Sequence, residues 1–110
     1  MKKKVAIIGK GSFGKKIIKS IEKEVSFTEP KLSDWVVIAT PNDLHYEHVK
    51  KWIKEGKNVF CEKPLTLTQD SSKDLYNLAE ANGVRLYVDD IFNWFVDKNI
   101  FKSKRKKTYN

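Results

Sequence analysis

Residues 3–14, with the sequence KKVAIIGKGSFG, decide the fold. The first half is a short apolar run with β-branched residues, which is typical of a buried strand. The second half is a complete G-x-G-x-x-G motif, and a helical pattern of apolar residues begins at Phe13. A strand, a glycine turn and a helix in this order predict a nucleotide-binding turn. A glycine-rich turn that binds nothing is the alternative.

Each glycine of the motif has a mechanical reason. Gly9 lets the chain turn sharply off the strand, and Gly11 lets the backbone come close to a pyrophosphate. Gly14 lets the helix lie close to the strand. The phosphates would then meet free N–H groups at the positive end of the helix dipole.

Length, charge and cysteine content exclude several classes of protein. The chain has 110 residues, a net charge of +8 and a single cysteine, Cys61. We therefore expect one domain, without an internal disulfide or a zinc site built from several cysteines. No apolar run approaches the length that spans a membrane, and the start is too short for a signal peptide. The expected compartment is the cytoplasm, and no metal site is expected.

Positive charge is concentrated near the C-terminus, where five of the six residues 102–107 are basic. Such a run can bind nucleic acid or an acidic membrane. Because no nucleic-acid motif accompanies it, we interpret it as a solvated tail.

Apolar patterns beyond the first strand alternate between strand and helix. Helices are expected at 13–24, 44–55 and 69–82, and strands at 25–28, 35–39, 58–61 and 85–89. Asn42 or Asp43 is expected to cap the second helix and Thr68 the third, while Gly56 and Gly83 end them. This alternation predicts an α/β domain with a mostly parallel sheet and helices on both faces.

The link between the strands at 25–28 and 35–39 is unusually short. A parallel crossover normally needs a dozen residues or more, and usually contains a helix. If both strands flank the first one, the link spans roughly 20 Å, close to the reach of seven extended residues. We therefore expect a nearly straight link without a helix, and a sheet that is trimmed on this side.

Two further stretches resemble a known family. Residues 39–45 read ATPNDLH and residues 56–65 read GKNVFCEKPL. Together with the glycine turn, they resemble the N-terminal dinucleotide-binding Rossmann domain of the Gfo/Idh/MocA oxidoreductases. These enzymes include glucose–fructose oxidoreductase and inositol dehydrogenases. The resemblance covers most of the chain, from Val5 to about Phe92.

The resemblance implies a role for particular residues, with NAD or NADP as the cofactor. Lys63 would sit beside the reacting sugar carbon as the catalytic residue, after a Lys–Pro bond that is often cis in this family. Glu62 would contact the nicotinamide ribose. The full cofactor-binding set would comprise Gly9, Lys10, Gly11, Ser12, Phe13, Gly14, Thr40, Pro41, Asn42, His45, Glu62, Lys63 and Pro64.

The residues themselves leave alternatives open at this site. Gly9, Thr40 and Glu62 follow or end strands, and parallel strands end at one edge, where ligands of open α/β sheets bind. A lysine with a lowered pKa could take part in proton transfer there. Glu62 and Lys63 could equally form a surface ion pair worth almost nothing. His45 alone is more typical of a residue packed at a helix start than of a catalyst.

Two departures from the family affect the expected organisation. The adenosine-side strand and helix have no counterpart, since residues 25–34 look like the following strand and its loop. The substrate domain is missing as well. We therefore expect a dinucleotide-binding domain at 1–92, and an apolar segment with the basic tail at 93–110, as a remnant of or link to a substrate domain.

Three functions are compatible with this sequence. The first is the NAD(P)-binding domain of a sugar or nucleotide-sugar oxidoreductase, which is incomplete as an enzyme alone. The second is a non-catalytic Rossmann-fold remnant that binds a nucleotide, or that self-associates or regulates a partner through residues 91–101. The third, an adaptor that binds nucleic acid or membrane through its basic tail, requires steeply salt-dependent binding.

Overall fold

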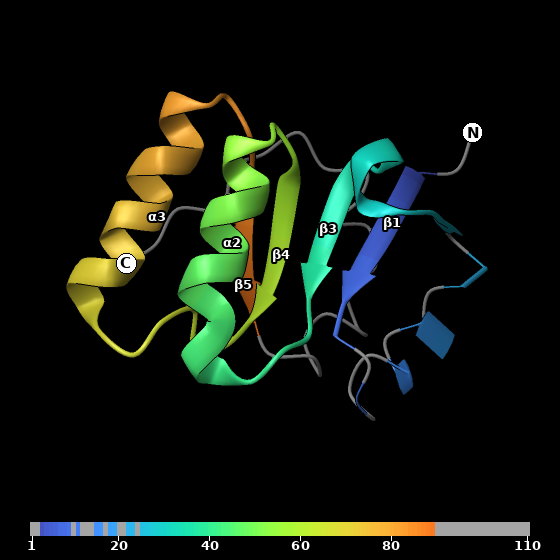
Figure 1. Cartoon of the computed structure of the whole chain (residues 1–110), viewed down its shortest axis with the longest axis horizontal. Coiled ribbons are helices and arrows are strands. Elements are labelled where there is room, and N and C mark those ends of the chain that lie inside the picture. Colours follow the sequence, from blue (N-terminus) through green and yellow to red (C-terminus); the bar gives the residue numbers. More distant parts are fainter. Residues whose placement is uncertain are drawn as a thin grey trace.

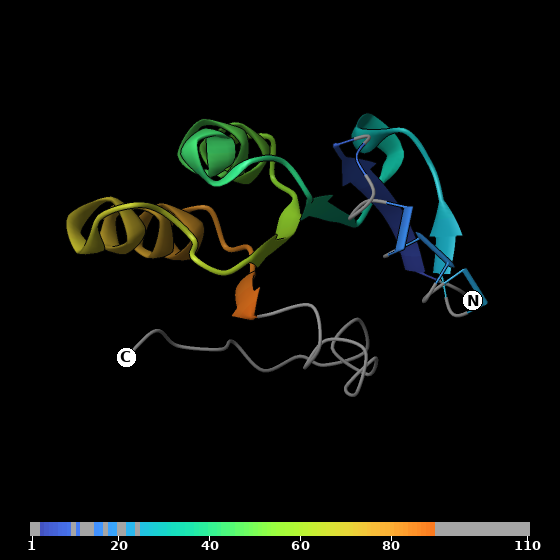
Figure 2. The same cartoon turned by 90° about the horizontal axis from the view of Figure 1, so that it is seen from below.

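The computed structural model describes residues 3–9, 11, 15, 16, 18, 19, 22, 23 and 25–89. Five strands form one parallel sheet with the order β2-β1-β3-β4-β5. They are β1 (Lys3–Ile8), β2 (Val25–Phe27), β3 (Trp35–Ile38), β4 (Asn58–Glu62) and β5 (Leu86–Asp89). Helices α2 (His45–Lys54) and α3 (Gln69–Ala81) lie side by side on one face of the sheet (Figure 1 and Figure 2). The expected Rossmann-like α/β fold is confirmed.

Strand β3 is buried on both faces because its side chains alternate between two apolar clusters. Val36 and Ile38 pack in the cluster that includes Val49 and Ile53 of α2. Trp35 and Val37 belong to the cluster on the opposite face. All four residues of β3 are at most 2% exposed, as expected for a central strand of a parallel sheet.

The predicted ends of α3 are confirmed, whereas the side-chain cap predicted for α2 is wrong. The side chain of Thr68 accepts a hydrogen bond from Ser71 N at the start of α3. Neither Asn42 nor Asp43 caps α2, because both belong to a 3-10 turn, η2 (Asn42–Leu44), that precedes it. Backbone hydrogen bonds of this turn replace the side-chain cap. The expected left-handed glycines after α2 and α3 have φ angles of +79° and +66°.

Parts of the prediction lie outside the described residues. Of the first expected helix, residues 15, 16, 18 and 19 are helical, whereas residues 22 and 23 form a turn, so the helix ends before the predicted residue 24. The apolar segment 91–101 and the basic tail are not among the described residues. In the part of the chain that is described, no helix is long and apolar enough to cross a lipid bilayer.

The link between β2 and β3 differs from the straight connection expected from the sequence. Phe27 and Trp35 pair with the same residue, Val5, on its two sides. The link therefore crosses two strand spacings, about 9.5 Å, and need not run back along a strand. This shorter path leaves room for a 3-10 turn, η1 (Pro30–Leu32).

Polar contacts hold this short link against the sheet. The ammonium group of Lys57 donates hydrogen bonds to the carbonyl oxygens of Lys31 and Ser33, at 2.8 and 2.9 Å. Asp34 N donates to Lys4 O at 2.8 Å, and Lys4 N donates to a carboxylate oxygen of Asp34 at 3.2 Å. The residue before β4 and the start of β1 thus fix the middle of the turn and the residues that follow it.

Strand β2 takes the place directly beside β1. In the doubly wound order 3-2-1-4-5-6, that place belongs to the second strand. The sequence interpretation had instead likened these residues to the third strand. Among the described residues, no strand lies outside β2.

Candidate nucleotide-binding edge of the sheet

The carboxyl ends of the strands meet at one edge of the sheet. The strands point in the same direction, with the arrowheads of β1, β3 and β4 at the bottom of Figure 1. Ile8 pairs with Ile38, and Ile38 pairs with Cys61, so the last residues of β1 and β3 form a lateral row with Cys61, which precedes the last residue of β4. Gly9, Thr40 and Glu62, predicted from separate motifs, therefore lie at the same edge.

The glycine turn has one crowded position and one open position. Gly9 has a φ of +121°, and a Cβ atom there would collide with the carbonyl oxygen of Ala39. Among the described residues, no atom lies within 4 Å of a Cβ placed on Gly11. Lys15 N donates to Gly11 O at 3.3 Å, which starts the helical segment. The open space over Gly11 is what the backbone needs to approach a phosphate, so the described part of the turn fits a pyrophosphate.

Four residues of the glycine motif that were predicted to bind the cofactor are not described by the structure. Lys10, Ser12, Phe13 and Gly14 lie outside the described residues.

Thr40 is held by two histidines of α2. Nε2 of His45 lies 2.9 Å from Thr40 O, and Nδ1 of His48 lies 3.1 Å from Thr40 Oγ1. His45 is 1% exposed, and its Nδ1 lies 2.8 Å from Pro64 O. The ring of His45 therefore contacts the backbone just after β3 and just after β4, and so joins the segments that follow these two strands.

Sequence reasoning missed His48. Its signal was its position three residues after His45, because residues i and i+3 of a helix share one face. At the start of α2, that face turns toward Thr40. Pro41 and Asn42, in contrast, are exposed, so they can reach a ligand at this edge.

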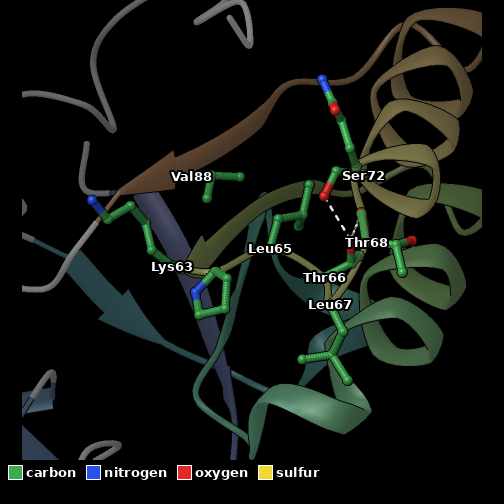
Figure 3. A pocket seen from close by; sticks show the side chains of 9 residues that line it. Lys63, Leu65, Thr66, Leu67, Thr68, Ser72 and Val88 are labelled. Atoms are coloured by element: carbon green, nitrogen blue, oxygen red, sulfur yellow. Dashed lines mark hydrogen bonds between the residues drawn. The ribbon is translucent and has the colours of Figure 1, made fainter.

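Glu62 and Lys63 end β4 in different surroundings. Glu62 is half-buried and Lys63 is exposed. The peptide bond between Lys63 and Pro64 is cis, as the resemblance implied. Lys63 lines one end of an open pocket of about 710 Å³ (Figure 3).

The other end of this pocket is polar and belongs to the start of α3. The hydroxyls of Thr66 and Ser72 lie 2.6 Å apart, and the Thr66 hydroxyl donates to Thr68 O at 2.6 Å. Figure 3 shows Leu65 between this pair and Lys63. The pocket lining thus combines one lysine, three residues whose hydroxyl groups are engaged with the protein (Thr66, Thr68 and Ser72), the amide of Gln69, and apolar side chains.

Cys61 has no features of a reactive thiol. Burial raises the pKa of the Cys61 thiol far above its usual range, and the negative charge of Glu62 raises it further. The neutral thiol is therefore held in the core. Within the described part of the chain, no group of three or more His, Cys, Asp or Glu residues could hold a metal ion.

Comparisons with known proteins agree with this geometry. The model of the Gfo/Idh/MocA oxidoreductase family, with an NAD-binding Rossmann fold, matches residues 26–90. This range contains the Thr40 and Glu62 motifs and begins after the glycine turn.

Individual relatives match most or part of the chain. An uncharacterized oxidoreductase of Streptococcus pneumoniae is 39% identical over 82 residues, which are 74% of this chain and 22% of that protein. The 2,7-anhydro-N-acetylneuraminate hydratase of Escherichia coli is 43% identical over 65 residues, which are 59% of this chain and 18% of that protein. The chain thus spans about a fifth of the length of these curated relatives.

The fold also matches that of solved structures. The structure of GenD2 from gentamicin A biosynthesis, in complex with NAD, matches with a TM-score of 0.72 at 22% identity. The match covers 80% of this chain and 34% of that chain. At this identity the likeness concerns the fold alone.

Proposed function

The chain belongs to the Gfo/Idh/MocA oxidoreductases with an NAD-binding Rossmann fold, and we propose that it is the cofactor-binding domain of such an oxidoreductase. The open backbone at Gly11 supports this proposal most directly, because it lies at the same sheet edge as Thr40, Glu62 and Lys63. The cofactor is NAD or NADP. When bound, the nicotinamide would accept or donate a hydride.

Two groups of residues at this edge of the sheet would contact different parts of the cofactor. Gly9 and Gly11, with the rest of the glycine motif, hold the pyrophosphate at the start of the first helix. Thr40, Pro41 and Asn42 line the groove on the nicotinamide side. His45 supports this side from beneath, through its contact with Thr40 O.

Glu62 and Lys63 act where the cofactor meets the substrate. We assign Glu62 to the nicotinamide ribose, with Pro64 closing this end of the groove. Lys63 is the proposed catalytic residue, since it is exposed and lines the open pocket, and its ammonium can donate a hydrogen bond to a substrate hydroxyl. The substrate class is a secondary alcohol of a sugar or a nucleotide-sugar. A relative named for a sugar-acid substrate supports this class, although that relative is a hydratase.

The chain supplies only part of an active site. The domain occupies 1–92, and 93–110 connects it to, or remains from, a substrate domain. Because the relatives are about five times longer, we propose that turnover requires residues beyond those of this chain, or a partner chain.

The trimmed sheet favours a second candidate function. Since no strand lies outside β2 among the described residues, the adenosine side is narrower than in the six-stranded order. The chain would then be a non-catalytic remnant that binds a nucleotide weakly, or a self-associating or regulatory protein that uses residues 91–101. Sedimentation of the full chain, with and without residues 91–110, tests self-association.

A cofactor titration tests the first proposal. NADH and NADPH are titrated into the full chain while nicotinamide fluorescence and heat are followed. Saturable micromolar binding that is lost in Gly11→Trp supports a working groove, because the indole would fill the space that a phosphate needs. Gly83→Ala, which changes a glycine outside the motif, serves as the control for altered backbone. Absence of binding at millimolar cofactor would contradict the proposal.

A further inference from the structure

We propose that His45 is a positioning residue that fixes the turn at Lys63 and Pro64 relative to the end of β3. This inference rests on the proposed function, which assigns Thr40 and Lys63 to the nicotinamide side of the groove. The inference is based on two contacts of the imidazole ring. Nδ1 of His45 lies 2.8 Å from Pro64 O, and Nε2 lies 2.9 Å from Thr40 O.

The chemistry of the two contacts explains why the ring joins these segments. A carbonyl oxygen can only accept a hydrogen bond, so each contact becomes a bond when the facing ring nitrogen carries a hydrogen. Each neutral tautomer of His45 bonds one of the two carbonyls, and the doubly protonated ring bonds both. The side chain of His45 is 1% exposed, while Thr40 is half-buried and Pro64 is exposed. In each protonation state, His45 therefore donates a hydrogen bond to at least one of the two carbonyls.

The place of the contact in the sheet explains why it matters for the site. Strands β3 and β4 are paired up to Ile38 and Cys61. Beyond these residues, one segment enters η2 and α2, and the other enters the loop that leads to α3. His45 bridges the two segments just after they separate. The position of Lys63 relative to Thr40 thus depends on this ring, and a shift of about 1 Å in a positioned group can cost a site about a hundredfold in rate.

Thr40 is fixed independently at its side chain. Nδ1 of His48 lies 3.1 Å from Thr40 Oγ1, one helical turn after the ring of His45. His48 can therefore hold Thr40 when His45 is changed, while the Lys63–Pro64 turn loses its contact with α2. This asymmetry predicts that changes at position 45 displace Lys63 more than they displace Thr40.

Two conservative variants separate the two contacts. The amide nitrogen of an asparagine can stand close to the place of Nδ1, so His45→Asn keeps the donor to Pro64 O and removes the donor to Thr40 O. The longer glutamine can place its nitrogen near Nε2, so His45→Gln keeps the donor to Thr40 O and removes the other. His45→Phe keeps a ring and removes both donors.

The test combines amide NMR spectra of the full chain with binding of two ligands. In spectra without ligand, His45→Gln should move the amide signals of Lys63 and Leu65. His45→Asn should move that of Asn42 and leave those two in place. NADH, which carries the nicotinamide, should bind about tenfold more weakly to His45→Phe, the scale of one or two lost hydrogen bonds. ADP, which lacks both the nicotinamide and its ribose but keeps the pyrophosphate, should bind all variants within about twofold, because each variant retains the glycine turn.

The outcomes distinguish positioning from a general loss of stability. Equal losses of NADH and ADP affinity, or the same shift pattern in all three variants, would overturn the inference. If His45→Phe does not fold, the asparagine and glutamine variants decide by the same criteria. If the unchanged chain binds neither ligand, the proposed function fails, and the shifts alone decide: localised shifts support the inference, and diffuse or absent shifts overturn it.

Discussion

Gly9, at the end of β1, lies so close to Ala39, just after β3, that a Cβ atom at position 9 would collide with the carbonyl oxygen of Ala39. Two neighbouring strands thus reach the proposed groove in backbone contact, with no side chain between them at this point. Gly11, two residues later, has open space instead. The first glycine therefore serves the fold, and the second is available to a ligand.

Alanine at these two positions should have opposite effects. Gly9→Ala is expected to cost more than about 3 kcal/mol of unfolding free energy, or to prevent folding, because it combines a backbone collision with a positive φ. Gly11→Ala should change stability by less than about 0.5 kcal/mol. Denaturation by urea measures both. Equal stability of the two variants would contradict the structural assignment of the turn.

Lys57 should stabilise the shortened link between β2 and β3. Lys57→Met removes both hydrogen bonds to the link while keeping a side chain of similar length, and should cost about 1–2 kcal/mol of unfolding free energy. Lys54→Met, at the exposed end of α2, should stay within about 0.5 kcal/mol of the unchanged chain. Thermal unfolding of both variants provides the comparison. If Lys54→Met lowered the unfolding free energy as much as Lys57→Met, the loss of a positive charge would explain both effects. The hydrogen bonds of Lys57 to the link would then not be the cause.

The start of α3 should depend on the hydroxyl of Thr68. Thr68→Ala removes the acceptor for Ser71 N and should cost about 1 kcal/mol. Thr68→Ser retains that acceptor and should restore most of the loss. Amide hydrogen exchange of the first turn of α3 reports the effect locally. Exchange that is unchanged in the alanine variant would show that the cap contributes nothing.

Cys61 should resist alkylation as long as the chain is folded. Because burial raises the pKa of its thiol, the reactive thiolate is suppressed in the folded state. Iodoacetamide should therefore modify Cys61 at a rate that follows unfolding, with rapid reaction in denaturant. Fast modification of the folded chain at pH 8 would contradict the buried position of Cys61.

The same shift makes stability depend on pH. In the unfolded chain the Cys61 thiol titrates near its ordinary pKa of 9.0, while in the folded chain it stays protonated well above that value. The unfolded state thus loses a proton that the folded state keeps, and stability falls as the pH rises above about 9. Relative to Cys61→Ala, the unchanged chain should lose about 1 kcal/mol per pH unit in that range. Parallel pH profiles of the two proteins would contradict this reasoning.

The strands and helices were predictable because the sequence pattern is strong. The run from Trp35 to Ile38 is apolar throughout, and only a strand buried on both faces accommodates such a run. Gly56, Thr68 and Gly83 mark helix ends for local reasons, which do not depend on distant residues. The cap expected at Asn42 or Asp43 was wrong because a 3-10 turn has backbone hydrogen bonds of its own.

The path of the β2–β3 link depended on tertiary pairing, so the sequence could not determine it. The expected straight link assumed that β2 spans the whole length of β1. In the structure Phe27 and Trp35 pair with the same residue, Val5. Such a register follows from how the strands pack against their neighbours, and residue spacing does not reveal it.

The candidate site was predictable in its position and less so in its internal contacts. Gly9, Thr40 and Glu62 lie at one edge because parallel strands end there. The sequence suggested that His45 packs at a helix start, but its two carbonyl partners could not be inferred. Pro64 O comes within reach only when the loop after β4 passes over the start of α2. The contact between His48 and the Thr40 hydroxyl depends on the same packing.

The most direct measurement is an amide NMR titration of the full chain with NADH. The account predicts saturable shifts of the Gly9, Gly11, Thr40, Glu62 and Lys63 signals, which belong to one edge of the sheet. Signals of Gly56 and Gly83 should stay in place, because these residues precede β4 and β5 at the opposite ends of the strands. Shifts centred on Gly56 and Gly83, or no shifts at millimolar NADH, would contradict the assignment of this edge as a nucleotide-binding site.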